Sequence, residues 1–133
     1  MYLIDTNIWL EVLLEQEKTA ESHEFLEITE SSFLHITDFS LYSIGIILTR
    51  LKKLDVLNKF VSDVIIESKV SIILFNPEDI KEIIKVEKEF GLDFDDSYQY
   101  VSAEKYDLTI VSFDSDFDKT EKGRIIPETS KRE

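Results

Sequence analysis

The chain has no cysteine and little glycine or proline, with 3 Gly and 2 Pro in 133 residues. The absence of cysteine excludes a disulfide framework and any metal site built from thiolates. A reducing cytoplasm is therefore the expected location. No repeat, low-complexity tract or long linker is visible. With 43% hydrophobic residues, the chain is expected to fold as one domain over residues 1–133, of which 127–133 form a polar tail.

A long hydrophobic run is also missing. The apolar start at residues 1–4 stops at Asp5, so neither a signal peptide nor a membrane span is expected, and the protein should not associate with a membrane. Positive charge is scarce, because 28 acidic residues face 15 basic ones and the net charge is −13. Such a charge repels a nucleic-acid backbone at long range unless cations or basic patches intervene. An acidic, well-solvated surface explains the charge about as well as a basic protein partner does.

What the chain does contain is an alternation of apolar runs and helical patterns. Strands are predicted at 1–4, 32–36, 70–75 and 108–113, with a fifth at 124–126. Helices are predicted at 8–15 and 19–30, after Thr37 or Asp38, at 55–68, between Asn76 and Gly91, and between Asp93 and Asp107. This order predicts an α/β fold, a single compact domain with a central, mainly parallel sheet of four to five strands flanked by helices.

Aspartates stand where two of these strands end. Asp5 follows the run 1–4, and Asp114 follows the run 108–113. In an open α/β sheet, ligands bind outside the carboxyl ends of the strands, so neighbouring strands would bring both side chains to one place. A third acidic segment, 92–98, opens a predicted helix, and there Asp93 suffices as the cap and leaves Asp96 for a site. Asp116 lies two residues beyond Asp114 in a short turn.

Each of these residues also has a simpler interpretation. Asp5 could do no more than cap the next helix, and Asn7 could form an Asx turn instead of orienting Asp5. Asp96 could simply complement the positive end of its helix. Against this, three aspartates within four residues, 93–96, exceed what helix capping needs. We therefore predict that the acids form one metal site.

The composition of such a site selects the metal. Two carboxylates about 4 Å apart repel by roughly 4 kcal/mol at an effective dielectric constant of 20, so a cluster of them requires a cation. Oxygen ligands without histidine or cysteine favour Mg²⁺ or Mn²⁺ over Zn²⁺. Magnesium held by few carboxylates keeps positions open for substrate phosphates. The chemistry indicated is metal-assisted hydrolysis of a phosphodiester.

Three segments carry a resemblance to a known family. LIDTNIWLE at 3–11, LDFDDSYQYVSA at 92–103 and LTIVSFDSDFDK at 108–119 resemble, in this order and spacing, the acidic motifs of PIN domains. The resemblance covers nearly the whole chain. It implies a compact α/β ribonuclease dependent on Mg²⁺ or Mn²⁺, with RNA as substrate. Many small members are VapC-like toxins, so a homodimer and an antitoxin partner are implied as well.

The same resemblance implies roles for individual residues. Asp5, Asp96 and Asp114 match the metal-binding, catalytic acids of the family, and Asp116 matches a less constant fourth acid. Asn7 matches the polar residue that supports the first acid.

One position departs from the family pattern. In the stretch ITDFSLYSIGIIL, residues 36–48, Ser43 stands about where the family carries a glutamate. A serine can hydrogen-bond a metal-bound water, so Ser43 keeps a supporting role, but it supplies no charge. Asp38, one turn earlier, would either replace the missing carboxylate or cap the helix.

Two other functions stay open. A PIN-like module that has lost catalytic strength and acts through protein contacts would explain Ser43 and the charge of −13. A different acidic phosphotransfer domain, such as a response-regulator receiver or a haloacid-dehalogenase-like phosphatase, fits less well because Asp5 is followed by Thr6 and Asn7. Lys119, Lys122 and Arg124 would either contact a phosphate backbone or be ordinary solvated charges. Trp9 and Phe39 are predicted to be core or interface residues and not base-stacking platforms.

Overall fold

The computed structural model describes residues 1–128, so residues 129–133 of the predicted polar tail lie outside the described part of the chain. The centre of the fold is a parallel sheet in the order β3-β2-β1-β4. Its strands are β1 (Tyr2–Ile4), β2 (Leu34–Thr37), β3 (Ser71–Ile73) and β4 (Thr109–Val111). The predicted α/β fold with a parallel sheet is confirmed.

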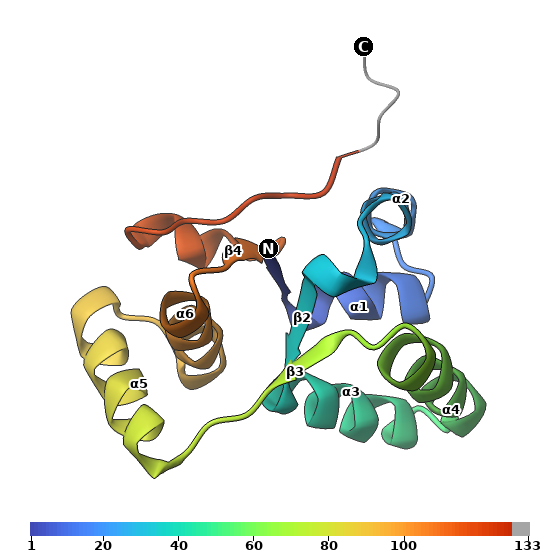
Figure 1. Cartoon of the computed structure of the whole chain (residues 1–133), viewed down its shortest axis with the longest axis horizontal. Helices are drawn as coiled ribbons and strands as arrows, with labels where there is room; N and C mark the ends of the chain where they lie inside the picture. The colour runs from blue at the N-terminus through green and yellow to red at the C-terminus, as the bar shows by residue number, and fades with distance from the viewer. Residues whose placement is uncertain (129–133) are drawn as a thin grey trace.

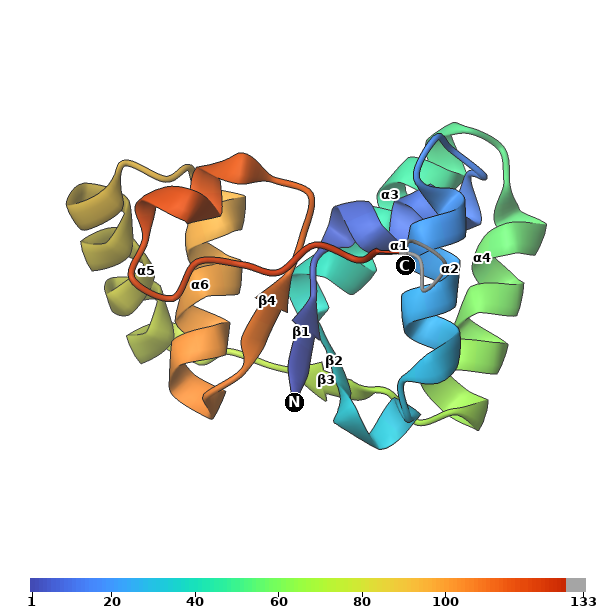
Figure 2. The ribbon, with the colours of Figure 1, turned by 90° about the horizontal axis from the view of Figure 1, so that it is seen from above.

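Helices cover both faces of the sheet (Figures 1 and 2). The helices α5 (Pro77–Phe90) and α6 (Phe94–Tyr106) lie on one side. On the other side lie α1 (Thr6–Leu13), α2 (Thr19–Ile28), α3 (Asp38–Arg50) and α4 (Leu54–Phe60). Within residues 1–128, no helix is both long enough and apolar enough to cross a membrane.

The central strands β1 and β4 each contribute to two cores because successive side chains point to opposite faces. Leu3 and Ile110 belong to the cluster under α5 and α6, whereas their neighbours Ile4 and Val111 belong to the cluster under α1 to α4. All four side chains are fully or almost fully buried. Burial on both faces explains why these strands read as continuous apolar runs in the sequence.

The predicted helix ends agree with the caps in the structure. Thr37 accepts a hydrogen bond from the Ser40 N–H at the start of α3, and Asp93 accepts one from the Asp96 N–H at the start of α6. A capping box joins Asn76 and Asp79 at the start of α5.

Two predicted elements differ from the structure. Leu41, Ile44, Leu48, Leu51 and Leu54 recur at helical spacing, but α3 ends at Arg50 because Lys52 adopts a left-handed backbone with φ of 59°. Leu51 and Leu54 are consequently 51% and 59% exposed. The predicted strand at 124–126 forms only a single parallel bridge, between Val111 and Ile125.

The strand order locates the functional end of the sheet. The chain runs from β1 to β2 and β3 on one side, and β4 returns to the other side of β1. The sheet therefore has its topological switch point between β1 and β4, where α/β proteins bind ligands at the carboxyl ends of the strands. Asp5 and Asp114 lie beyond these two ends.

Candidate metal centre

A cleft of about 270 Å³ opens at the carboxyl ends of β1 and β4. Its walls come from the start of α1, from one face of α3, from the start of α6 and from the turn after β4. The lining residues are Asp5, Thr6, Asn7, Phe39, Ser43, Ile47, Asp95, Asp96, Gln99 and Asp114. Asp5, Asn7, Ser43, Asp96 and Asp114, which are distant in the sequence, thus line one cleft.

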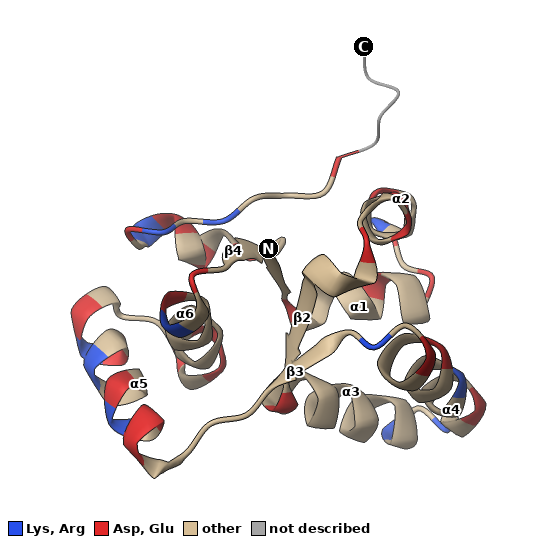
Figure 3. Cartoon of the chain, in the orientation of Figure 1, with Lys and Arg blue, Asp and Glu red and all other residues tan. Residues whose placement is uncertain are grey.

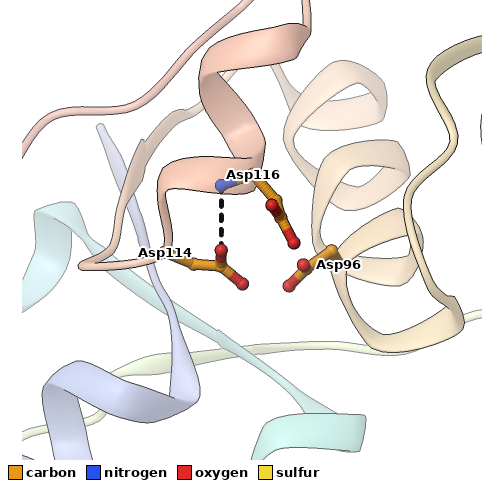
Figure 4. Close-up of side chains that lie close together, drawn as sticks. All are labelled: Asp96, Asp114 and Asp116. Carbon is orange, nitrogen blue, oxygen red and sulfur yellow. Dashed lines mark hydrogen bonds between the residues drawn. The ribbon is translucent and has the colours of Figure 1, made fainter.

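Three of the predicted acids face one another (Figure 4), and two of them, Asp96 and Asp114, line this cleft, whereas Asp116 does not. Asp96, Asp114 and Asp116 each offer a carboxylate oxygen, and these oxygens lie within 4.8 Å of one another. Asp114 precedes the 3₁₀ helix Ser115–Lys119 and accepts a hydrogen bond of 2.9 Å from the Asp116 N–H. The fully buried Phe117 anchors this turn in the core. The arrangement leaves the three carboxylates directed at a common space.

Asp96 is the most buried member of the cluster, at 7% exposure. Because Asp93 caps α6, the Asp96 side chain is not used for capping. Within residues 1–128, its buried Oδ2 has no hydrogen-bond partner. Burial raises the pKa of Asp96, and both a hydrogen bond to Asp114 and the negative charge of Asp114 add to the rise, which brings the pKa to about 8. A buried, unpartnered carboxylate oxygen beside two other carboxylates fits a hard divalent cation such as Mg²⁺ or Mn²⁺.

Asp5 lies in the same cleft but is held by neutral donors. Its Oδ1 accepts hydrogen bonds of 2.8 Å from the Thr6 N–H and from Gln99 Nε2, and its Oδ2 accepts one of 2.6 Å from Ser112 Oγ. Burial raises the pKa of Asp5, although these three hydrogen bonds oppose the rise. Asp5 is not one of the three acids that converge within 4.8 Å.

Asn7 acts on Asp5 through Ser112. Asn7 Nδ2 donates to Ser112 Oγ at 3.3 Å, and Asn7 Oδ1 accepts from the Phe113 N–H at 3.3 Å. Ser112 Oγ also accepts a 2.9 Å hydrogen bond from the Asp114 N–H. Ser112 thereby links Asp5 to the turn that carries Asp114.

The α3 wall of the cleft contains Ser43 and no carboxylate. Asp38 does not line the cleft, because its Oδ1 accepts hydrogen bonds from the Phe39 N–H and the Tyr98 hydroxyl. The cap of α3 is Thr37. Asp38 therefore supplies neither the missing charge nor the cap.

Sequence reasoning missed Asp95, Gln99 and Ser112. Asp95 is not among the residues predicted for the site, yet it lines the cleft. Gln99 follows Asp96 by three residues, a spacing that places both on one face of a helix. After Thr109, Ser112 is the one polar side chain in the apolar run 108–113, and this isolated polar position could have identified it as a site residue.

The basic residues that follow the last motif are paired with other groups. Arg124 makes two 3.0 Å hydrogen bonds to Asp118 and one of 3.2 Å to the Ser112 carbonyl. Lys122 lies 3.9 Å from Asp107, and Lys119 donates to the Gly91 carbonyl at 3.5 Å. Of the described residues that line the cleft, none is basic.

Comparisons with known proteins agree with this fold. The family model for the PIN domain matches residues 2–123. A comparison with curated protein sequences found no match.

Several solved structures share the fold. A toxin–antitoxin complex from Klebsiella pneumoniae aligns with a TM-score of 0.77 and 17% identity over 96% of this chain and 98% of that one. VapC20 of Mycobacterium tuberculosis, described as a toxin that cleaves the sarcin–ricin loop, aligns with a TM-score of 0.79 and 13% identity over 96% and 100%. VapBC2 of Rickettsia felis, bound to a promoter DNA fragment, aligns with a TM-score of 0.71 and 15% identity over 94% of this chain and 96% of that one. At these identities the likeness concerns the fold alone.

Proposed function

The chain belongs to the PIN domain family, and from this premise we propose that it is an endoribonuclease that hydrolyses RNA phosphodiester bonds with Mg²⁺ or Mn²⁺. The observation that carries the proposal is the convergence of Asp96, Asp114 and Asp116 within 4.8 Å around the unpartnered Oδ2 of Asp96. A PIN family nuclease needs such a group of acids, and the chain supplies it at the switch point of its sheet.

In this proposal each residue has a separate task. Asp96, Asp114 and Asp116 would hold the cation, with Asp5 in the same cleft as a further acid. A bound divalent cation supplies Lewis-acid stabilisation of the phosphate and makes water more acidic. Gln99 and Ser112 orient the carboxylate of Asp5, and Asn7 fixes Ser112. Ser43 contributes a neutral hydroxyl to the wall of the cleft.

The proposal extends to partners and place. The solved complexes from Klebsiella pneumoniae and Rickettsia felis support a role as the toxin of a toxin–antitoxin pair. The cysteine-free composition favours the cytoplasm as its location. A homodimer is supported by an apolar hollow on α3 and α4, beside which Tyr42 and Ile46 are exposed. Such exposed apolar patches are typical of protein interfaces.

A cleavage assay with the full chain tests the activity. Wild type should cut RNA in Mg²⁺ or Mn²⁺ but not in EDTA, and Asp96→Asn or Asp114→Asn should abolish the cut. Asp63→Asn is the matched control, because Asp63 is an exposed partner of Lys59 and lies outside the cleft. Cleavage that persists in both cleft variants would show that the activity comes from another site or a contaminant.

A second candidate is the catalytically weakened interaction module. The observation that favours it is Ser43, which leaves the α3 wall without a carboxylate. Titration with Mn²⁺, combined with the cleavage assay, separates the two candidates. The interaction module should bind RNA or Mn²⁺ weakly and should not cut RNA, whereas Mn²⁺ binding together with RNA cleavage would reject it. Membership of the PIN family excludes the phosphotransfer domain as an alternative.

A further inference from the structure

Gln99 is a buried residue of the cleft whose hydrogen bonding is incomplete. It follows Asp96 by three residues on α6, so the two side chains share one face of that helix, and both line the cleft. Gln99 is only 2% exposed. Within residues 1–128, its Oε1 has no hydrogen-bond partner, and the same holds for Asp96 Oδ2. One face of α6 therefore carries two buried oxygens that accept from no donor in the described chain.

The orientation of the Gln99 amide is fixed by its nitrogen. Nε2 donates to Asp5 Oδ1 at 2.8 Å and to Ser40 Oγ at 2.9 Å, so both of its hydrogens are engaged. The opposite orientation would place Oε1 against the Asp5 carboxylate, and two acceptors repel. Ser40 is itself fully buried and hydrogen-bonded to Thr6 at 2.7 Å. The nitrogen thus holds the amide in place, while the oxygen is left without a partner.

The surroundings of Gln99 indicate what its oxygen binds. A buried acceptor without a partner loses its hydration without compensation, which destabilises the protein. No lysine, arginine or histidine is among the described residues that line the cleft. Asp96, on the same face of α6, points toward Asp114 and Asp116 (Figure 4). A cation attracted by these carboxylates also accepts amide oxygens as ligands, because both are hard oxygen donors.

We propose that Gln99 Oε1 is a neutral oxygen ligand of the divalent cation, in addition to the carboxylates. The proposal rests on the metal-dependent function proposed above and adds a residue to that site. It also gives the uncharged α3 wall a consequence, because the chain has Ser43 there and no carboxylate. Gln99 restores an oxygen ligand without restoring the charge. The loaded site is then less negative than it would be with a further carboxylate, so it repels a phosphate less in a chain of net charge −13.

Calorimetric titration of the full chain with Mn²⁺ tests this assignment. Gln99→Leu removes the amide at similar size and should weaken Mn²⁺ binding at least about 10-fold. Because Nε2 also orients Asp5, the decisive comparison uses an Asp5→Ala background, in which no carboxylate is left to orient. There, Gln99→Leu should again weaken binding about 10-fold or more, since the two losses are then separate. Gln16→Leu is the matched control, because Gln16 is the only other glutamine of the chain and lies outside the cleft.

A second measurement counts the water molecules on a bound ion. Tb³⁺ binds oxygen ligands, and its luminescence lifetimes in H₂O and D₂O give the number of coordinated waters. Gln99→Leu should add about one water, because a protein ligand is replaced by solvent. This comparison does not require that the double variant folds, and thermal melting curves check the folding of every variant.

The proposal is overturned if Gln99→Leu binds Tb³⁺ with the wild-type number of waters. It is also overturned if, in a folded Asp5→Ala background, Gln99→Leu leaves the Mn²⁺ affinity unchanged, since Gln99 would then act only through Asp5. A wild type that binds Mn²⁺ through Gln99 but never cuts RNA would refute the nuclease function and support the ligand. Metal-dependent cleavage by a Gln99→Leu variant with wild-type Mn²⁺ affinity would do the reverse.

Discussion

Asp96 is a carboxylic acid in surroundings that disfavour its charge. Burial and Asp114 raise its pKa, and its Oδ2 has no partner within the described chain. The cluster is therefore a local destabilisation of the metal-free protein, since like charges about 4 Å apart repel by several kcal/mol at low dielectric. A divalent cation reverses the sign of this interaction, so metal binding should stabilise the fold.

We predict that Asp96→Asn separates these two effects. In EDTA the variant should melt at a higher temperature than wild type, because folding forces the buried Asp96 to take up a proton beside Asp114, whereas asparagine is already neutral. With Mn²⁺ the order should invert, since only wild type gains stability from the ion. Differential scanning fluorimetry over a Mn²⁺ titration measures both. Equal shifts of both proteins by Mn²⁺ would contradict a role for Asp96 in the site.

Ser112 is an orienting residue, and its removal should show in metal affinity. Ser112→Ala deletes the 2.6 Å hydrogen bond to Asp5 and the acceptor for the Asp114 N–H. Loss of groups that orient metal ligands typically costs about 10- to 100-fold in affinity. Isothermal titration with Mn²⁺ should show a loss in that range. Ser102→Ala is the control, because Ser102 is buried on α6 and its hydroxyl, among residues 1–128, bonds only the Tyr98 carbonyl.

At Ser43 a metal ligand can be added to the cleft instead of removed from it. Ser43→Glu places a carboxylate on the uncharged wall of the cleft, where the family carries a glutamate. We expect tighter Mn²⁺ binding and a lower melting temperature in EDTA, since the added charge attracts the ion and repels the existing acids. Ser43→Gln has nearly the same size without the charge and should do neither. If both variants weaken Mn²⁺ binding alike, the wall excludes the longer side chain sterically.

At the scale of elements, most of the fold follows from local signals. The strands ending before Asp5 and Asp114 were predictable because burial on both faces makes a short continuous apolar run. The start of α5 was predictable because Asn76, Pro77 and Asp79 satisfy separate demands of a helix start. A break between two helices before residue 55 was predictable, but its position after Arg50 was not, because Lys52 adopts φ of 59° without glycine's freedom. Likewise, Gln99 and Ser112 gained their roles only from contacts with Asp5, 94 and 107 residues away.

The start of α5 also has a defined pH dependence. Burial alone would raise the pKa of Asp79, but hydrogen bonds from the Asn76 N–H and the Lys105 ammonium lower it below 3.8 overall. A depressed folded-state pKa contributes stability above the unfolded value, and that contribution is lost as the pH falls through the folded value. Lys105→Met should therefore reduce the free energy of unfolding near neutral pH. On acidification, the free energy of unfolding of this variant should fall by less than that of wild type. Urea denaturation between about pH 3 and pH 7 tests this. Lys85→Met is the control, because it removes an ion pair with Glu82 that is exposed on α5.

The whole molecule combines a strong negative charge with exposed apolar surface. Acidic residues appear on helices of both layers, and α5 carries both signs (Figure 3). Two chains of −13 each repel one another, whereas the hollow lined by Leu41, Tyr42, Ile46 and Leu57 favours association. Salt screens the repulsion over about 10 Å at 0.1 M and leaves the apolar attraction largely intact. The two contributions therefore respond differently to ionic strength.

If this hollow is the interface of a homodimer, added NaCl should increase the dimer fraction. Ile46→Asp should give a monomer at all salt concentrations, because it places a charge in the apolar contact, while Mn²⁺ affinity stays unchanged since Ile46 lies outside the metal cleft. Sedimentation velocity measures the association. Ile84→Asp, on an exposed face of α5 in the other layer, is the control and should not alter it. Dimers that dissociate as salt rises would instead indicate an interface built on ion pairs, for which Arg50 is the one charged residue among the described residues that line this hollow.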